Sequence, residues 1–319
     1  MDSAGAILKA MWTTMRPYLL FVSAITGVAG VAMSPPPSAF PLLAIFIASF
    51  FAYGFGQALT DCFQTDTDAI SAPYRPLASG AVSRTPILFM SLIGLTICAA
   101  VYALFNLWNV FLGLLATTGL ATYTTFKRHW WGGPWYNAWI VVTLCVMGFL
   151  AGTGNTPPHF GHGFVPMLGT VFFGYANFVL AGYFKDISAD RATGYFTLPV
   201  VFGRRAATYV SDALAVSFLA AAVWTASLGI DPSPQPLALI AGLLFGIPGF
   251  LHLVSAQAQL HRNDDDASAF RPIHHVVHGY ILVLSGLVAI LRPEWTILLI
   301  IHYAAFTIVL ARRPEVTQI

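Results

Sequence analysis

Ten long apolar runs constrain this chain more than any other feature of its sequence. A helix of roughly 20 apolar residues crosses the hydrocarbon core of a bilayer. Of the 319 residues, 57% are hydrophobic and only 9% are charged, whereas soluble domains carry about 25% charged residues. The sequence therefore predicts an all-α polytopic membrane protein of 9–10 spans. We expect these spans at about 17–33, 39–60, 85–105, 107–126, 135–153, 164–184, 207–228, 235–257, 275–291 and 295–311.

The lysines and arginines predict the orientation of the spans, because cytoplasmic loops are enriched in these residues. If the N-terminus is cytoplasmic, fourteen of the fifteen lie on that side and only Arg292 lies outside. We therefore expect ten spans with both termini cytoplasmic, in a bacterial cell membrane. No basic patch with interleaved aromatic residues is present in the sequence, so nucleic acid is not an expected partner.

The stretch TDCFQTDTDAISAPYRPLASG, residues 60–80, gathers acidic residues at the cytoplasmic end of the second span. If the helix continues past Thr60, then Asp61, Gln64 and Asp68 share one face at i, i+3 and i+7. Asp66 then points away from that face. A second stretch, FKDISADRATG, follows the sixth span and places Asp186 and Asp190 at i and i+4.

Two carboxylate faces at the same membrane surface predict a site that binds a cation. Converging carboxylates repel one another unless a cation lies between them, and Mg²⁺ usually bridges one or two carboxylates to substrate phosphates. Arg75, Lys127 and Lys185 would then complement the phosphate charge. The alternative is that the aspartates are solvated helix caps and that the basic residues only reflect the topology.

The segment RPIHHVVHGY offers a second, weaker candidate site. His274 and His278 have the i, i+4 spacing that can bind zinc. His275 or His278 could instead contact an acceptor or act as a base. The alternative is an interfacial helix start with solvated histidines.

Three motifs in order resemble the UbiA superfamily of intramembrane prenyltransferases. Members carry an NDxxDxxxD-type motif with a YRPL-x-SG turn, and a DxxxD motif after a later helix. Residues 60–80 align without gaps with the form of chlorophyll synthase-like and 4-hydroxybenzoate polyprenyltransferase-like members, and residues 183–203 resemble the second motif. Between them, YTTFKRHWWGGPWYNAW resembles the family's tyrosine–lysine–arginine segment. The resemblance covers about residues 12–291 of a single domain, 1–319.

The resemblance implies a helical bundle around a central cavity that opens to the cytoplasmic side. Mg²⁺ would bind the diphosphate of an isoprenoid donor there, and a lipophilic or aromatic acceptor would be alkylated. It implies the metal ligands Asp61, Asp68, Asp186 and Asp190, which are also catalytic candidates with Arg75 and Lys127. It implies substrate contacts at Gln64, Asp66, Asn137, Tyr183 and Lys185.

The sequence departs from the family pattern at four points. Thr60 replaces the leading Asn of the first motif, and Gln64, which carries no charge, replaces its middle Asp. Asp66 is an additional carboxylate that could compensate if the helix unwinds. The span at 295–311 is one more than the nine associated with the family.

We therefore expect a Mg²⁺-dependent prenyltransferase that transfers an alkyl group other than methyl. Because the departing allylic chain is carbocation-like, aromatic faces would stabilise it, and Tyr53, Tyr123, Trp135 and Tyr183 lie at a suitable depth. The altered first motif keeps a terpene cyclase on the same fold as an alternative, in which the donor reacts alone. A transporter is disfavoured, because the carboxylates cluster at the cytoplasmic end and not at the bilayer midplane.

Overall fold

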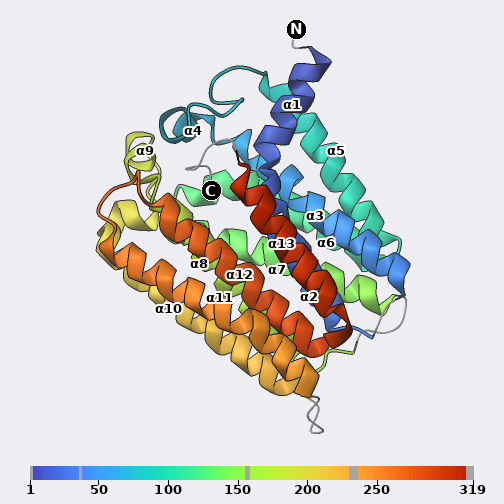
Figure 1. The fold of residues 1–319 in the computed structure, drawn as a ribbon. Coiled ribbons are helices and arrows are strands. Elements are labelled where there is room, and N and C mark those ends of the chain that lie inside the picture. The colour runs from blue at the N-terminus through green and yellow to red at the C-terminus, as the bar shows by residue number, and fades with distance from the viewer. Residues whose placement is uncertain (1–2, 36–37, 155–158, 230–235, 314–319) are drawn as a thin grey trace.

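The fold is a bundle of long helices with two short helices at one end (Figure 1). The computed structural model describes residues 3–35, 38–154, 159–229 and 236–313. The helices are α1 (Ala4–Met15), η1 (Pro17–Leu19), α2 (Leu20–Ala32), α3 (Ala39–Asp61), α4 (Thr65–Ser71), α5 (Arg84–Ala103), α6 (Trp108–Lys127), α7 (Gly133–Thr153), α8 (Phe164–Tyr183), α9 (Ile187–Ala192), α10 (Leu198–Gly229), α11 (Pro236–Arg262), α12 (Phe270–Leu291), η2 (Pro293–Trp295) and α13 (Thr296–Ala311).

Eight of these helices are long and apolar enough to cross a membrane. The count is nine if α1 forms one broken span with η1 and α2, to which it is bent by 41° near Arg16. The predicted span at 107–126 does form a helix, α6, but it does not pass the same test of composition. Five threonines in α6 lower its hydropathy. The chain is an integral membrane protein.

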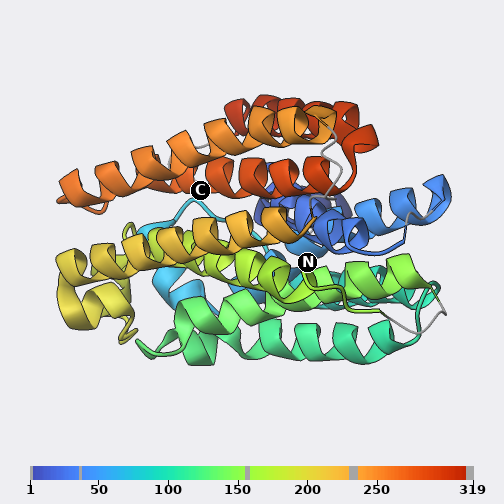
Figure 2. The same cartoon turned by 90° about the horizontal axis from the view of Figure 1, so that it is seen from below.

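Among the eight single-helix candidate spans, α12 and α8 are the most buried. Within their most apolar windows, 83% of α12 and 72% of α8 is buried, against 22% of the window in α13. Figure 2 shows α11, α12 and α13 along one edge of the bundle, with the teal-to-green α5 and α6 along the opposite edge. The additional helix α13 therefore lies at the periphery.

Glycines let α2 and α7 approach closely, as is common between membrane helices. A Cβ atom at Gly30 would lie 1.9 Å from the carbonyl oxygen of Cys145, and one at Gly148 would lie 2.2 Å from that of Gly27. Any side chain at these positions would push the two helices apart. This contact fixes α7, and with it Asn137, against the first part of the chain.

Candidate active site

The first acidic stretch forms a broken helix, not the continuous one that we expected. α3 ends at Asp61 and α4 begins at Thr65. Asp61, Gln64 and Asp68 nevertheless line one pocket, and each is less than a tenth exposed. The predicted convergence of these three side chains is therefore confirmed, although the break and not helical spacing produces it.

Asp66 lies outside this pocket. Its carboxylate accepts hydrogen bonds from Arg128 Nη2 at 2.9 Å and from the Tyr195 hydroxyl at 3.1 Å. About 41% of its side chain is exposed. The structure thus gives no support to Asp66 as a substitute for the missing charge at Gln64, because its carboxylate faces away from the pocket-lining side chains of α4.

The second acidic stretch lies opposite, around α9, which lies beside α4 (Figure 1). Asp186 immediately precedes α9 and lines the pocket. Asp190 is fully buried and is not among the lining residues. It lies behind Lys127, whose Nζ is 3.5 Å from Asp190 Oδ1, and it accepts a hydrogen bond from Thr197. The shared face predicted for Asp186 and Asp190 is therefore only partly formed.

Seven charged residues line what we call the polar pocket. They are the cations Arg16, Arg75, Lys127 and Lys185 and the carboxylates Asp61, Asp68 and Asp186. The pocket therefore presents four cationic side chains beside three carboxylates along its walls. Cationic side chains form charge-assisted hydrogen bonds to phosphate groups, and carboxylates are ligands for Mg²⁺.

Ion pairs tie two of these three carboxylates to cations. Arg75 donates to Asp68 at 2.5 Å, and Arg16 donates to Asp61 at 3.0 Å. Burial raises the pKa of Asp68, against the opposing effect of Arg75. Burial, together with the nearby Arg75 and Arg16, lowers the pKa of Lys185 to about 8, although Asp186 acts in the opposite direction.

Arg16 is a pocket residue that the sequence analysis missed. It was counted there only as a charge that sets the topology. The residue has left-handed backbone with φ 51°, a conformation that costs most non-glycine residues about 1–3 kcal/mol. Its guanidinium contacts both carboxylate oxygens of Asp61. The available signal was the segment Met-Arg-Pro, a cation and a helix breaker between two apolar helical runs.

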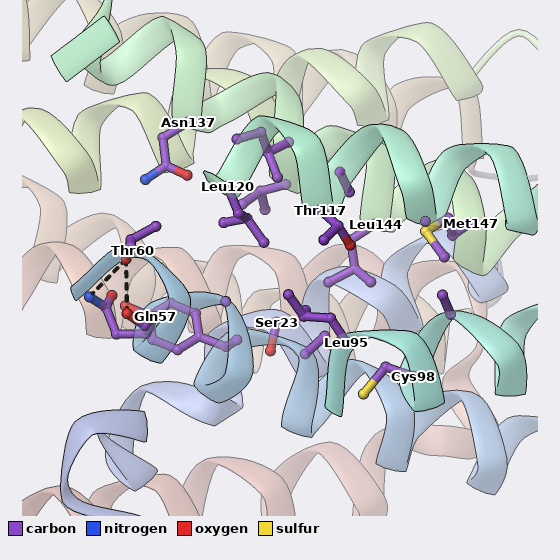
Figure 3. Close-up of a pocket in the computed structure, with 18 of the residues that line it drawn as sticks. Ser23, Gln57, Thr60, Leu95, Cys98, Thr117, Leu120, Asn137, Leu144 and Met147 are labelled. Atoms are coloured by element: carbon purple, nitrogen blue, oxygen red, sulfur yellow. Dashed lines mark hydrogen bonds between the residues drawn. The ribbon is translucent and has the colours of Figure 1, made fainter. Parts of the chain in front are cut away.

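A second pocket, which we call the apolar pocket, continues from the polar one. The two share Tyr53, Gln57, Thr60, Asn137 and Tyr175. In Figure 3, Gln57, Thr60 and Asn137 lie at one end of the apolar pocket, and Cys98 and Met147 lie at the other. Its walls come mainly from α3, α5, α6 and α7, with Ser23 of α2 and Tyr175 of α8, and they border about 770 Å³ of space that is partly open to the surroundings. A charged compartment and an apolar compartment thus lie end to end.

Aromatic side chains surround the junction of the two pockets. Tyr53, Tyr123 and Tyr183 line the polar pocket as expected, and Tyr175, which was not predicted, lines both. Lys127 Nζ lies 5.2 Å from the centroid of the Tyr183 ring. Trp135 is not among the lining residues and packs against the main core.

The carboxylates of the polar pocket suit Mg²⁺ only in part, because too few of them come together to hold the ion alone. Within the described ranges, no three His, Cys, Asp or Glu side chains come together closely enough to hold a metal ion alone. Asp186 Oδ1, however, is buried and has no hydrogen-bond partner among the described residues. An unpaired buried carboxylate oxygen is a suitable Mg²⁺ ligand, and Mg²⁺ commonly takes its remaining ligands from phosphates and water. The residues fit a metal that binds together with a diphosphate.

The histidines give no support to a zinc site in the described part of the chain. The rings of His274 and His278 are 4.4 Å apart, and His278 Nδ1 forms a 2.8 Å hydrogen bond with the Tyr303 hydroxyl. His252 adds a third ring, stacked on His278. No histidine is among the residues that line the polar pocket. In the described part of the chain the histidines therefore act as packing between α11, α12 and α13.

The fold and this site define a class of protein: a membrane-embedded helical bundle with two aspartate-bearing breaks above an apolar pocket. The model of the UbiA prenyltransferase family matches residues 20–277. The digeranylgeranylglyceryl phosphate synthase of Natronomonas pharaonis is 31% identical over 246 residues, which cover 74% of this chain and 76% of that protein. The chain belongs to the UbiA prenyltransferase family.

Solved structures agree with this fold. A UbiA homologue from Aeropyrum pernix K1 superposes with a TM-score of 0.66 at 20% identity, covering 91% of this chain and 96% of that one. A UbiA homologue from Archaeoglobus fulgidus bound to GPP and Mg²⁺ gives a TM-score of 0.61 at 15% identity, covering 86% and 99%.

Proposed function

We propose that the protein transfers a prenyl group from an isoprenoid diphosphate to a lipophilic acceptor within the membrane. One observation carries the proposal: a pocket lined by four cations and three carboxylates adjoins an apolar pocket, and five residues line both. The diphosphate would occupy the first and the prenyl chain the second. The bond that breaks would then lie at the junction, beside Tyr53 and Tyr175.

The pocket residues divide by role. Asp61, Asp68 and Asp186 would hold Mg²⁺, which when bound neutralises the diphosphate and makes it a better leaving group. Arg75 and Lys127 would stabilise the charge that develops as the C–O bond breaks, with Lys185 and Arg16 nearby. Asp190 would orient Lys127. Gln64, which accepts a hydrogen bond from Lys127 at 3.1 Å, and Asn137 would contact the substrate.

The apolar pocket would also protect the reaction. A carbocation-like prenyl group reacts with water, so a site that excludes water favours transfer. The faces of Tyr53, Tyr123, Tyr175 and Tyr183 would stabilise the positive charge. Lys127 already lies over the Tyr183 ring, which is consistent with a ring face turned toward the pocket.

The name of the relatives suggests the first substrates to test. We propose geranylgeranyl diphosphate as the donor and geranylgeranylglyceryl phosphate as the acceptor, with a phenolic acceptor in parallel. The test is diphosphate release by the purified protein in detergent, with and without Mg²⁺. Release that needs Mg²⁺ and an acceptor supports a transferase, and Mg²⁺-dependent release from the donor alone would instead indicate the cyclase. No release from any donor would contradict both functions.

Prenyl-chain length should depend on the volume of the apolar pocket. Ala116 lines it on α6, so Ala116→Phe should shorten the space for the chain. We expect kcat/KM for geranylgeranyl diphosphate to fall by at least tenfold, about the effect of 1–3 kcal/mol in an apolar pocket. The kcat/KM for dimethylallyl diphosphate should fall much less.

Leu115→Phe is the matched control, because Leu115 is 40% exposed and is not among the lining residues. Equal losses of kcat/KM in both variants would contradict the assignment of the apolar pocket to the prenyl chain.

We further propose that the polar pocket opens to the cytoplasm and that both termini lie on that side. The fourteen-to-one distribution of lysines and arginines supports this orientation. Labelling of single cysteines in intact cells tests it, and an impermeant reagent should react at Arg292→Cys but not at Arg271→Cys. The relatives compared above are archaeal, so they do not support the expected bacterial membrane.

A further inference from the structure

Asp66 is an acidic residue that the polar pocket does not use, and its contacts join three separate segments of the chain. Its carboxylate binds Arg128, which follows α6, and Tyr195, which follows α9. The guanidinium of Arg128 also lies 4.5 Å from the centroid of the Tyr195 ring. These three residues thus connect α4, the α6–α7 connection and the segment after α9.

This contact lies directly behind a charged part of the pocket. Lys127 and Arg128 are consecutive but point in different directions: Lys127 contacts Gln64 and Asp190, whereas Arg128 contacts Asp66. The Tyr195 ring lies between them, with Lys127 Nζ at 5.3 Å from its centroid. A shift of Arg128 would therefore carry Lys127 with it.

The same segment also holds Asp190 in place. Tyr195 is fully buried, and its amide donates a 2.8 Å hydrogen bond to the carbonyl oxygen of Asp190. The Phe196 amide donates to the carbonyl oxygen of Arg128 at 3.0 Å. Backbone and side-chain contacts of Arg128 therefore act on the segment that carries Asp190.

We propose that Asp66, Arg128 and Tyr195 form a latch that positions Lys127 and Asp190 for binding of the diphosphate. They are positioning residues, because none of the three is among the residues that line the polar pocket. The assignment of a diphosphate ligand rests on the proposed function; the closure of α4 onto α9 by the latch does not.

The latch gives a physical meaning to two departures in the first motif. Gln64 offers Lys127 a neutral hydrogen bond where the family pattern has a carboxylate, so Lys127 has one charged partner, Asp190, among the ion pairs of the described residues. Asp66, two residues later, does not replace that charge in the pocket and instead binds the neighbouring Arg128. The contact with Asp66 thereby holds the segment that carries Lys127 and Arg128 from the side away from the polar pocket.

The rate of disulfide formation between α4 and the segment after α9 reports whether the latch holds them together, and it requires no ligand. The hydroxyl oxygens of Thr67 on α4 and Thr193 after α9 are 3.0 Å apart, so Thr67→Cys with Thr193→Cys should place two sulfur atoms within bonding reach. The three native cysteines are buried. Under copper phenanthroline we expect this pair to form a disulfide, several-fold more slowly when Asp66→Asn or Tyr195→Phe is added. Equal rates with and without Asp66→Asn would overturn the latch.

A binding measurement tests the positioning role. We expect Asp66→Asn to weaken binding of geranylgeranyl thiolodiphosphate with Mg²⁺ by about fivefold, the upper range for an ion pair this exposed. Two changes should restore it: the 67–193 disulfide, reversibly with dithiothreitol, and the charge swap Asp66→Lys with Arg128→Glu.

Asp212→Asn is the matched control. It breaks a similarly exposed contact, between the Asp212 carboxylate on α10 and the His261 ring on α11 at 2.8 Å, that includes none of the three latch residues. We expect it to change neither the disulfide rate nor the affinity. Weakened binding in Asp66→Asn that neither the disulfide nor the charge swap restores would overturn the positioning role. A parent protein that closes the disulfide but does not bind the analogue would contradict the proposed function and leave the closure by the latch established.

Discussion

Replacing Asp186 by asparagine should reduce the rate of Mg²⁺-dependent diphosphate release by more than about a hundredfold. Substitutions of residues that only support the metal ligands already cost about 10–100-fold in affinity or activity, and Asp186 is proposed as a ligand itself. In the described part of the chain, Asp186 forms none of the ion pairs that tie Asp61, Asp68 and Asp190 to a cation. Its buried Oδ1 has no hydrogen-bond partner there. It is thus the carboxylate most available to a metal. An asparagine preserves the shape but removes the charge that a hard divalent cation requires.

The measurement is the initial rate of diphosphate release as a function of Mg²⁺ concentration. We expect the residual activity of Asp186→Asn to saturate at higher Mg²⁺ than that of the parent, and Asp186→Glu to recover part of it. Asp212→Asn controls for the loss of a carboxylate remote from the pocket. A rate for Asp186→Asn near that of the parent would rule out Asp186 as a metal ligand.

The sequence predicted the fold class well, because the fold class depends on local patterns. Apolar runs of sufficient length mark membrane helices. The two aspartate stretches were expected at helix ends on the same side of the bundle, and α4 and α9 do lie side by side. The count of spans was less certain, since threonines make α6 only weakly apolar although it packs in the bundle.

The individual roles of charged residues were harder to predict, because they depend on the direction of each side chain. A continuous helix through Gln64 was the simplest reading of the spacing, and the break there cannot be read from i, i+3 and i+7 positions. The helical spacing placed Asp66 away from the shared face, whereas the resemblance named it as a substrate contact and named Asp190 as a metal ligand. In the structure Arg128 holds the first outside the pocket, and Lys127 covers the second. Long-range pairing between cations and carboxylates decides such cases, and a single sequence does not contain it.

Arg16 gives the clearest example of such a pairing, and its replacement should have the largest effect on stability. The Arg16 and Asp61 side chains are only 10% and 4% exposed. Breaking a buried ion pair by removing one partner typically costs about 3–5 kcal/mol, because the remaining charge is left buried and unpaired. Gln57 also donates to Asp61, at 2.6 Å, which places the expected loss for Arg16→Gln near the lower end of that range.

A second substitution separates stability from function. If the unpaired charge of Asp61 causes the loss, then Arg16→Gln with Asp61→Asn should recover most of the free energy of unfolding, since no buried charge remains unpaired. Diphosphate release should stay low in the double variant, because Asp61 is a proposed metal ligand. Unfolding in one detergent provides the measurement, with the exposed Arg271→Gln as the control. A double variant no more stable than Arg16→Gln would show that Arg16 acts mainly through its bend between α1 and η1, and not through its charge.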